Sequence, residues 1–379
     1  MKLHSVCTLA ALFVLPCSSL LAASFAQTNL VSDGVVPALT TDVNLKDAWG
    51  MSFSPGTTPG TGSPIWVSDR DTGVSTLYSG SGVKANLTVN VPPGAPNGPT
   101  GQVFAGGTTF RLNNSPVNFI FDTLGGTIDA WNGGAGMTAV IMVTAAVSNN
   151  ANYTGLALAN NTLYAANFKT GGGIDVYDST FAPTTVSGHF TDATLPAGYA
   201  PYNVQNINGV LYVEYAKVTN GVPVSQPGGG GYVDEFDSNG VLIKRLVSNG
   251  PLNGPWGVAV VPGSGFGQFA SGDVLIGNFN SGDIDVFDPN GNFLQTLKDI
   301  NGNSLVNGGL WALSFDPNAP GTTDTGALYF TAGPNMGNDG IFGKIDAVPE
   351  PGTWALAVLG VLAAMSFRRV VKREGQPRS

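Results

Sequence analysis

Short apolar stretches alternate with turn residues along most of the chain, and one short sequence motif recurs six times. Each copy places a small residue ahead of apolar residues at alternate positions, as in Trp256-Gly257-Val258-Ala259-Val260. The small residue stands at positions 50, 101, 155, 203, 257 and 312, so successive copies are 51, 54, 48, 54 and 55 residues apart. Alternation with a period of two predicts β-strands, and the regular spacing predicts a repeated structural unit.

A second sequence motif follows each copy of the first. Its clearest examples are Leu163–Asp178 and Val274–Asp288, in which two short apolar runs flank a turn rich in Gly, Asn, Asp or Ser. This pattern predicts a β-hairpin. The turn Asp288-Pro289-Asn290-Gly291 then leads into a fourth strand at Phe293–Leu297. Six units of four strands predict an all-β fold, a six-bladed β-propeller. A β-sandwich would not repeat its strands at this period.

The last unit lacks a fourth strand of its own. Its third strand ends near Ile345, whereas Asn29–Asp33 has the pattern of a fourth strand such as Arg245–Asn249. We therefore expect the N-terminal strand to close the last blade.

The first residues have the three parts of a secretory signal. A positive start at Lys2 precedes an apolar run from Val6 to Leu15, and the small residues Ser24 and Ala26 form a small-x-small site. This pattern predicts a signal peptide over residues 1–26 that is removed after Ala26. An uncleaved anchor would need a longer apolar run.

The C-terminus has a second three-part pattern, over residues 348–373. Prolines end the domain of residues 27–347, an apolar run predicts a transmembrane helix over 353–371, and basic residues follow, which predicts a cytoplasmic end at 374–379. The prolines and acidic residue are Pro349, Glu350 and Pro351, and the basic anchor is Arg368, Arg369, Lys372 and Arg373.

This tail resembles the PEP-CTERM sorting signal, with Pro349-Glu350-Pro351 as its motif. The resemblance implies export across the inner membrane, transient anchoring by the C-terminal helix, and processing by an exosortase partner. Proteins with this signal are surface or matrix components of Gram-negative bacteria that make exopolysaccharide, so a final place at the cell surface or outside the cell is implied.

The repeated motifs resemble those of NHL-type and related six-bladed propellers over residues 29–347. The match departs from that pattern in the first two copies and in the insert Lys217–Gly231. The whole chain is similar to PEP-CTERM-tailed propeller proteins of no assigned activity. The resemblance therefore implies a fold and a cellular location, but it implies no enzymatic activity.

Composition excludes several classes of function. Residues 27–347 contain 10 Lys and Arg against 23 Asp and Glu, which leaves a net charge of −13 and excludes nucleic acid as a partner. Both cysteines, Cys7 and Cys17, lie in the predicted signal, and so does His4, which leaves only His189 in the mature chain. Disulfides, zinc thiolate sites and chemistry with several histidines are therefore excluded.

A polar residue near the end of the second strand recurs in five units, and Ala332 interrupts the series in the sixth. Equivalent positions in a propeller form a ring, and oxygen ligands in an acidic body suit Ca²⁺. The alternative is that these side chains cap the turn that follows the strand. The predicted metal ligands are Asp69, Asp122, Asn167, Glu214 and Asn278.

Two functions follow from these patterns. The first is a binding module that offers its loops and channel mouth to an exopolysaccharide, a surface protein or a cation. The second is a divalent-metal-dependent hydrolase or lyase of the gluconolactonase type. The gap at Ala332 and the scarcity of histidine favour the binding module over the enzyme.

Overall fold

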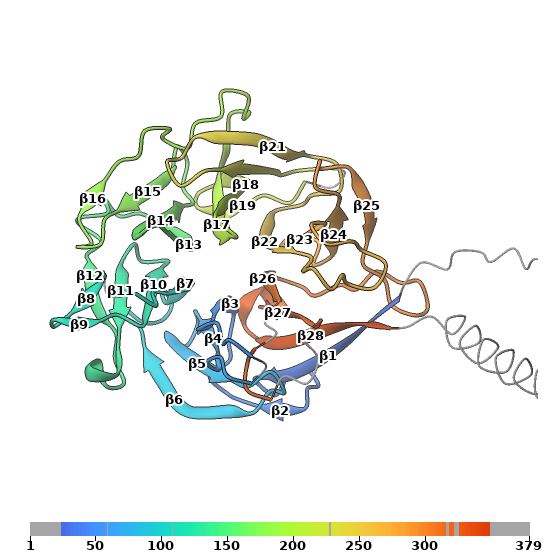
Figure 1. Ribbon diagram of the computed structural model, residues 1–379, viewed down its shortest axis with the longest axis horizontal. Helices are drawn as coiled ribbons and strands as arrows, with labels where there is room; N and C mark the ends of the chain where they lie inside the picture. Colours follow the sequence, from blue (N-terminus) through green and yellow to red (C-terminus); the bar gives the residue numbers. More distant parts are fainter. Residues whose placement is uncertain are drawn as a thin grey trace, which may run out of the picture. The chain divides into compact units, whose positions relative to one another are not determined.

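Six β-sheets stand around a common centre in the part of the chain that the structure describes (Figure 1). The structure is a computed structural model that describes residues 24–348 other than 59, 108, 227–228, 316–317 and 322–325. Each sheet begins with a strand at the centre and continues outward through antiparallel neighbours. The predicted six-bladed propeller is therefore confirmed.

The first three blades follow one another along the chain, each with four strands. Blade one contains β3 (Ala48–Ser52), β4 (Ile65–Asp69), β5 (Val74–Tyr78) and β6 (Lys84–Asn90). Blade two contains β7 (Pro99–Phe104), β10 (Phe119–Thr123), β11 (Ile128–Trp131) and β12 (Val140–Val143), and the small hairpin of β8 (Arg111–Leu112) and β9 (Ser115–Pro116) lies between its first two strands in sequence. Blade three contains β13 (Tyr153–Ala159), β14 (Thr162–Asn167), β15 (Ile174–Tyr177) and β16 (Pro183–Thr184).

The other three blades repeat this order. Blade four contains β17 (Tyr199–Ile207), β18 (Val210–Thr219), β20 (Tyr232–Phe236) and β21 (Leu242–Ser248), with β19 (Val222–Pro223) paired to β18. Blade five contains β22 (Pro255–Val260), β23 (Val274–Asn278), β24 (Ile284–Phe287) and β25 (Phe293–Thr296). Blade six contains β26 (Leu310–Phe315), β27 (Leu328–Ala332), β28 (Ile341–Val348), β1 (Ser24–Ser32) and β2 (Thr40–Thr41), and two 3₁₀ turns lie at Gly133–Ala135 and Asn335–Gly337.

Blade six is completed by the N-terminus, as the sequence predicts. β1 pairs antiparallel with β28 from Ser24 opposite Val348 to Ser32 opposite Ile341, with a bulge between Asn29 and Val31. The strand starts earlier than the predicted Asn29–Asp33. Both ends of this propeller unit are thus neighbouring strands of one sheet.

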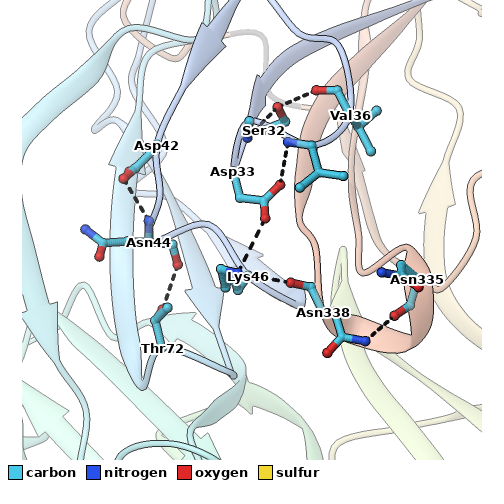
Figure 2. Close-up of polar contacts among 11 residues, drawn as sticks. Ser32, Asp33, Val36, Asp42, Asn44, Lys46, Thr72, Asn335 and Asn338 are labelled. Carbon is cyan, nitrogen blue, oxygen red and sulfur yellow. Dashed lines mark hydrogen bonds and ion pairs between the residues drawn. The ribbon is translucent and has the colours of Figure 1, made fainter.

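The segment after β1 fastens the closed ring. Figure 2 shows the Lys46 ammonium between Asp33 and Asn338: it lies 3.7 Å from a carboxylate oxygen of Asp33 and donates a hydrogen bond to the Asn338 carbonyl at 3.4 Å. Lys46 immediately precedes blade one, and Asn338 lies between β27 and β28. Through Lys46, the start of blade one is therefore joined to two parts of blade six, the end of β1 and the connection between β27 and β28.

The hydrophobic core lies between blades, because every blade buries both of its faces. Successive residues of a strand point to opposite faces. On β14, Leu163 and Ala165 pack against blade two, whereas Tyr164 and Ala166 pack against blade four. Since each face is covered only by the neighbouring blade, the blades stabilise one another around the ring.

Turn chemistry sets the outer hairpins. The Asp288 carboxylate accepts hydrogen bonds from the backbone N–H groups of Asn290 (2.8 Å) and Asn292 (2.9 Å). Asp237 does the same with Asn239 and Val241, at 2.8 and 2.9 Å. These aspartates shape the reversal between the third and fourth strands.

The predictions for the two ends of the chain fall almost entirely outside the described residues. This applies to the signal up to Ala23, the motif Pro349–Pro351, the helix 353–371 and the basic anchor. Within residues 24–348, apart from the gaps given above, no helix is long and apolar enough to cross a membrane.

Candidate functional site

A cluster of aromatic side chains fills the centre of the ring. The rings of Trp49 and Trp311 stack with centroids 3.5 Å apart, and Trp256 meets both edge-on at 6.3 and 5.6 Å. Tyr202 meets Trp311 edge-on at 5.8 Å, and Phe279 packs against Trp311 at 4.3 Å with the two ring planes tilted by 33°. All three tryptophans are buried, so the cluster is a plug near the start of the innermost strands.

Buried polar partners fix the tryptophans of this plug. The indole N–H groups of Trp49 and Trp311 donate to the two carboxylate oxygens of Asp47, at 2.6 and 3.1 Å. The Arg70 guanidinium donates to the same carboxylate. Trp256 donates instead to the Thr154 carbonyl of blade three at 2.9 Å. With every indole N–H paired, the plug has one defined arrangement.

A pocket opens beyond the plug, along the second halves of the innermost strands. Its volume is about 890 Å³, within the size range of small-ligand sites. Trp256 borders it, and side chains from the ends of the strands surround it. These side chains are Phe53, Phe104, Leu158, Ile207, Val260 and Phe315.

Most amide side chains in the pocket already join blades. The Gln102 amide donates to the carbonyls of Gly50 and Trp66, both at 2.8 Å. Asn203 donates to the Trp256 carbonyl, and Asn206 to the Leu158 carbonyl, both at 2.7 Å. The carbonyls of Gly50, Trp256 and Leu158 belong to innermost strands, which have no neighbouring strand on the side of the axis. The amides are therefore structural as well as pocket-lining.

Two polar groups of the pocket keep unused hydrogen-bonding capacity within the described part of the chain. The Ser52 hydroxyl makes no hydrogen bond there, but its oxygen is closed off from solvent and therefore from a ligand in the pocket. The Gln205 carbonyl accepts a long bond of 3.4 Å from the Val258 N–H, and no bond from its amide nitrogen is found among those residues. Among the described residues that line the pocket, none is Asp, Glu, His, Lys or Arg.

The five predicted calcium ligands do not occupy one equivalent position. In blade one Val67 pairs with Met51, and in blade four Val213 pairs with Val204, so Glu214 is equivalent to Ser68 and not to Asp69. Asp122 is displaced in the same way in blade two, where Phe121 pairs with Gln102. A shift of one residue turns a side chain to the other face of its sheet. The alignment of these two units is therefore corrected.

Asp69, Asn167 and Asn278 cap their own blades. The amide oxygens of Asn167 and Asn278 accept the backbone N–H groups of Asn152 (3.0 Å) and Asn253 (2.8 Å). Their amide nitrogens donate to carboxylates on the third strand of the same blade, which are those of Asp175 and Asp285. Asp69 accepts the Thr76 hydroxyl at 2.7 Å. These bonds hold each side chain within its own blade, and in blade five Asn278 also donates to Asp283 in the turn that follows its strand, at 2.9 Å.

Asp122 and Glu214 face the following blade and are wholly buried. Asp122 accepts the Thr100 hydroxyl (2.8 Å) and the Gly101 N–H (2.6 Å), and burial raises the pKa of its carboxyl to about 7. Neither carboxyl oxygen of Glu214 has a hydrogen-bond partner in the described residues, and burial holds its pKa well above the usual range. Both groups are thereby favoured in the neutral form.

The acidic residues of the predicted ring are not gathered into one cluster. No three His, Cys, Asp or Glu side chains lie close enough to hold a metal ion anywhere in the described residues. Asp69 and Asp122 are instead engaged by hydroxyl donors within the blades, Thr76 and Thr100. The pocket is therefore the better candidate site.

Comparisons with known proteins agree with the fold and the tail. Residues 347–370 match the PEP-CTERM protein-sorting motif. Uncharacterized protein L690 of Acanthamoeba polyphaga mimivirus is 29% identical over 331 residues, which are 83% of this chain and 84% of that protein. Uncharacterized protein R648 of the same virus is also 29% identical, over 83% of this chain and 78% of its own length.

One solved structure extends the comparison of the fold. An auxiliary nutrient binding protein from Bacteroides thetaiotaomicron matches with a TM-score of 0.54 and 11% identity, over 86% of this chain and 77% of its own. At this identity the likeness shows the fold alone. The chain thus joins a six-bladed β-propeller to a PEP-CTERM protein-sorting motif, which implies export to the cell surface and processing by an exosortase.

Proposed function

We propose that the propeller is a binding module whose pocket takes a segment of a neutral polysaccharide. The observation that carries this proposal is the uncharged lining: aromatic and aliphatic side chains surround the pocket, and the Gln205 amide has hydrogen-bonding capacity to spare. A sugar ring presents apolar faces to aromatic side chains and hydroxyls to amides and serines. A charged ligand would lose its hydration without gaining a counter-charge.

The charge of the whole domain supports the same class of ligand. Residues 27–347 carry a net charge of −13, which repels polyanions such as uronic acid polymers. A neutral glycan feels no such field. The enzyme alternative requires an acid or base at the ligand, and the described lining of the pocket supplies none.

The tail completes the proposal. We propose that the apolar segment 353–371 holds the exported protein in the membrane until an exosortase cuts near Pro349-Glu350-Pro351. The basic residues Arg368, Arg369, Lys372 and Arg373 would stay on the cytoplasmic side. Cleavage would then leave the propeller at the cell surface, where the resemblance to PEP-CTERM proteins implies contact with exopolysaccharide.

Calorimetric titration with neutral and anionic oligosaccharides tests the ligand class. We expect the purified propeller to bind a neutral oligosaccharide, with heat that an equal concentration of an oligouronate does not give. The variant Gln205→Ala should weaken binding by about two- to tenfold, the range of one neutral hydrogen bond.

The variant Gln295→Ala, outside the pocket lining, serves as a matched control that should bind normally. Stronger binding of the oligouronate, or equal binding by the pocket and control variants, would refute the proposal.

A further inference from the structure

Phe25 is a buried anchor of the N-terminal strand. Its side chain is only 1% exposed, and its ring packs against Phe266 and Phe269 with centroid distances of 4.8 and 5.8 Å. Its backbone N–H donates to the Lys298 carbonyl at 2.9 Å, and it pairs with Ala347 across the β1–β28 ladder. This residue therefore belongs to the folded propeller.

The segment that covers Phe25 also forms a wall of the pocket. The connection from β22 to β23, residues 261–273, borders the pocket at both of its ends, through Val261–Gly263 and Ser271–Gly272. In its middle, Phe266 lies between Phe25 and Phe315, a pocket residue whose ring centroid is 5.3 Å away. Phe25 thus supports the pocket wall from behind.

Gly267 shows how closely this segment fits. Its φ is +60°, and a Cβ placed on it would lie 3.1 Å from the Phe25 ring and 3.3 Å from the Ala347 Cβ. The turn is therefore pressed against β1 and β28 together. Removal of Phe25 would leave one side of this contact empty.

Signal removal after Ala26 conflicts with these contacts. It would delete Ser24, Phe25 and Ala26, which pair with Val348, Ala347 and Asp346. A second small-x-small site, Ala22-Ala23-Ser24, lies just upstream. We propose that the signal is cut before Phe25, and that the retained phenylalanine holds the pocket wall 261–273 in place. The link to ligand binding rests on the proposed function, but the position of the cut does not.

The first experiment locates the cut. The full chain, with its own signal, is produced in a Gram-negative host, and the N-terminal peptide of the protein recovered from the envelope is sequenced by mass spectrometry. We expect the first residue to be Phe25 or one that precedes it. A mature protein that starts at Gln27 would overturn the proposal.

The second experiment tests the support of the pocket wall. Hydrogen exchange is compared for the natural chain, Phe25→Ala and a matched control, Phe293→Ala, whose ring is half exposed on β25. In Phe25→Ala the amides of 261–273 should exchange at least about tenfold faster, and in the control they should not. Unchanged exchange would overturn this role.

If Phe25→Ala does not fold, Phe25→Leu serves in its place. This variant should show the same local increase in exchange rate, because leucine fills less of the space that the Phe25 ring occupies against Phe266 and Phe269. Normal exchange in that variant would also count against the role of Phe25. Failure of saccharide binding in every protein, with altered exchange in 261–273, would reject the proposed ligand and leave this inference standing.

Discussion

Replacement of Asp122 by asparagine should remove one contribution to the pH dependence of stability, which it shares with other buried carboxyls such as Asp129 and Asp234. The carboxyl is fully buried, and one of its oxygens has no partner in the described residues. Burial raises its pKa from 3.8 to about 7, despite hydrogen bonds from Thr100 and Gly101 that act in the opposite direction. Above pH 7 the folded protein must therefore keep a charge away from water.

The magnitude follows from proton linkage. The folded carboxyl holds its proton up to about pH 7, whereas the unfolded one releases it near pH 3.8. The contribution of Asp122 to the free energy of unfolding is therefore highest below pH 4, falls as the pH rises toward 7, and is level above that. The full difference is about 4 kcal/mol, of which about 2 to 3 kcal/mol lies between pH 5 and 8. The amide of the Asp122→Asn variant does not titrate, so this contribution disappears.

Urea denaturation at pH 5 and pH 8 measures the effect. The natural propeller should be less stable at pH 8, and Asp122→Asn should show a difference smaller by about 2 to 3 kcal/mol. Asp178→Asn is the control, because hydrogen bonds from Thr180 and Ala182 lower the pKa of Asp178, which is ionised in both states over this range. The reasoning is refuted if Asp122→Asn keeps the pH dependence of the natural chain.

Three further predictions concern the ring, the plug and the tail. A chain that begins at Lys46, and so lacks β1, should melt well below the full propeller in calorimetry, because β28 loses its partner strand; equal melting would contradict the closure. Trp311→Ala should lower the free energy of unfolding by about 3 to 5 kcal/mol, as judged by urea denaturation, whereas Met336→Ala at an exposed turn should have little effect. Intact-mass measurement of the protein from its native host should find a form without Arg368 and Lys372, and a mature form that keeps them would contradict processing of the tail.

The repeat could be predicted from the sequence because each unit carries the same strand and turn pattern. The position of Asn29–Asp33 in the last blade followed from its likeness to Arg245–Asn249, and β1 confirms it. The predicted ring was wrong in register because it was aligned on polar residues near strand ends. Equivalent positions on the second strands are those that pair with the small residue of the first strand, and in blade four Glu214 pairs with Asn203.

The pocket could not be predicted in the same way. Gln205 is an ordinary polar residue of an innermost strand, and its place beyond the plug gives it a role. The plug itself had a signal in the sequence. An aromatic residue precedes the small residue at Trp49, Tyr202, Trp256 and Trp311, so the repeat placed four rings at one level.

The pairing of β1 with β28 also constrains the kinetics of folding. Ser24 and Val348 are 324 positions apart, and yet they are partners in one ladder. Contacts between residues so distant in the chain form slowly, because a long loop must close before they are made. The strand that completes blade six is synthesised first and its partner last. The other five blades can therefore assemble while blade six stays incomplete, and we expect ring closure to be a late and slow step of folding.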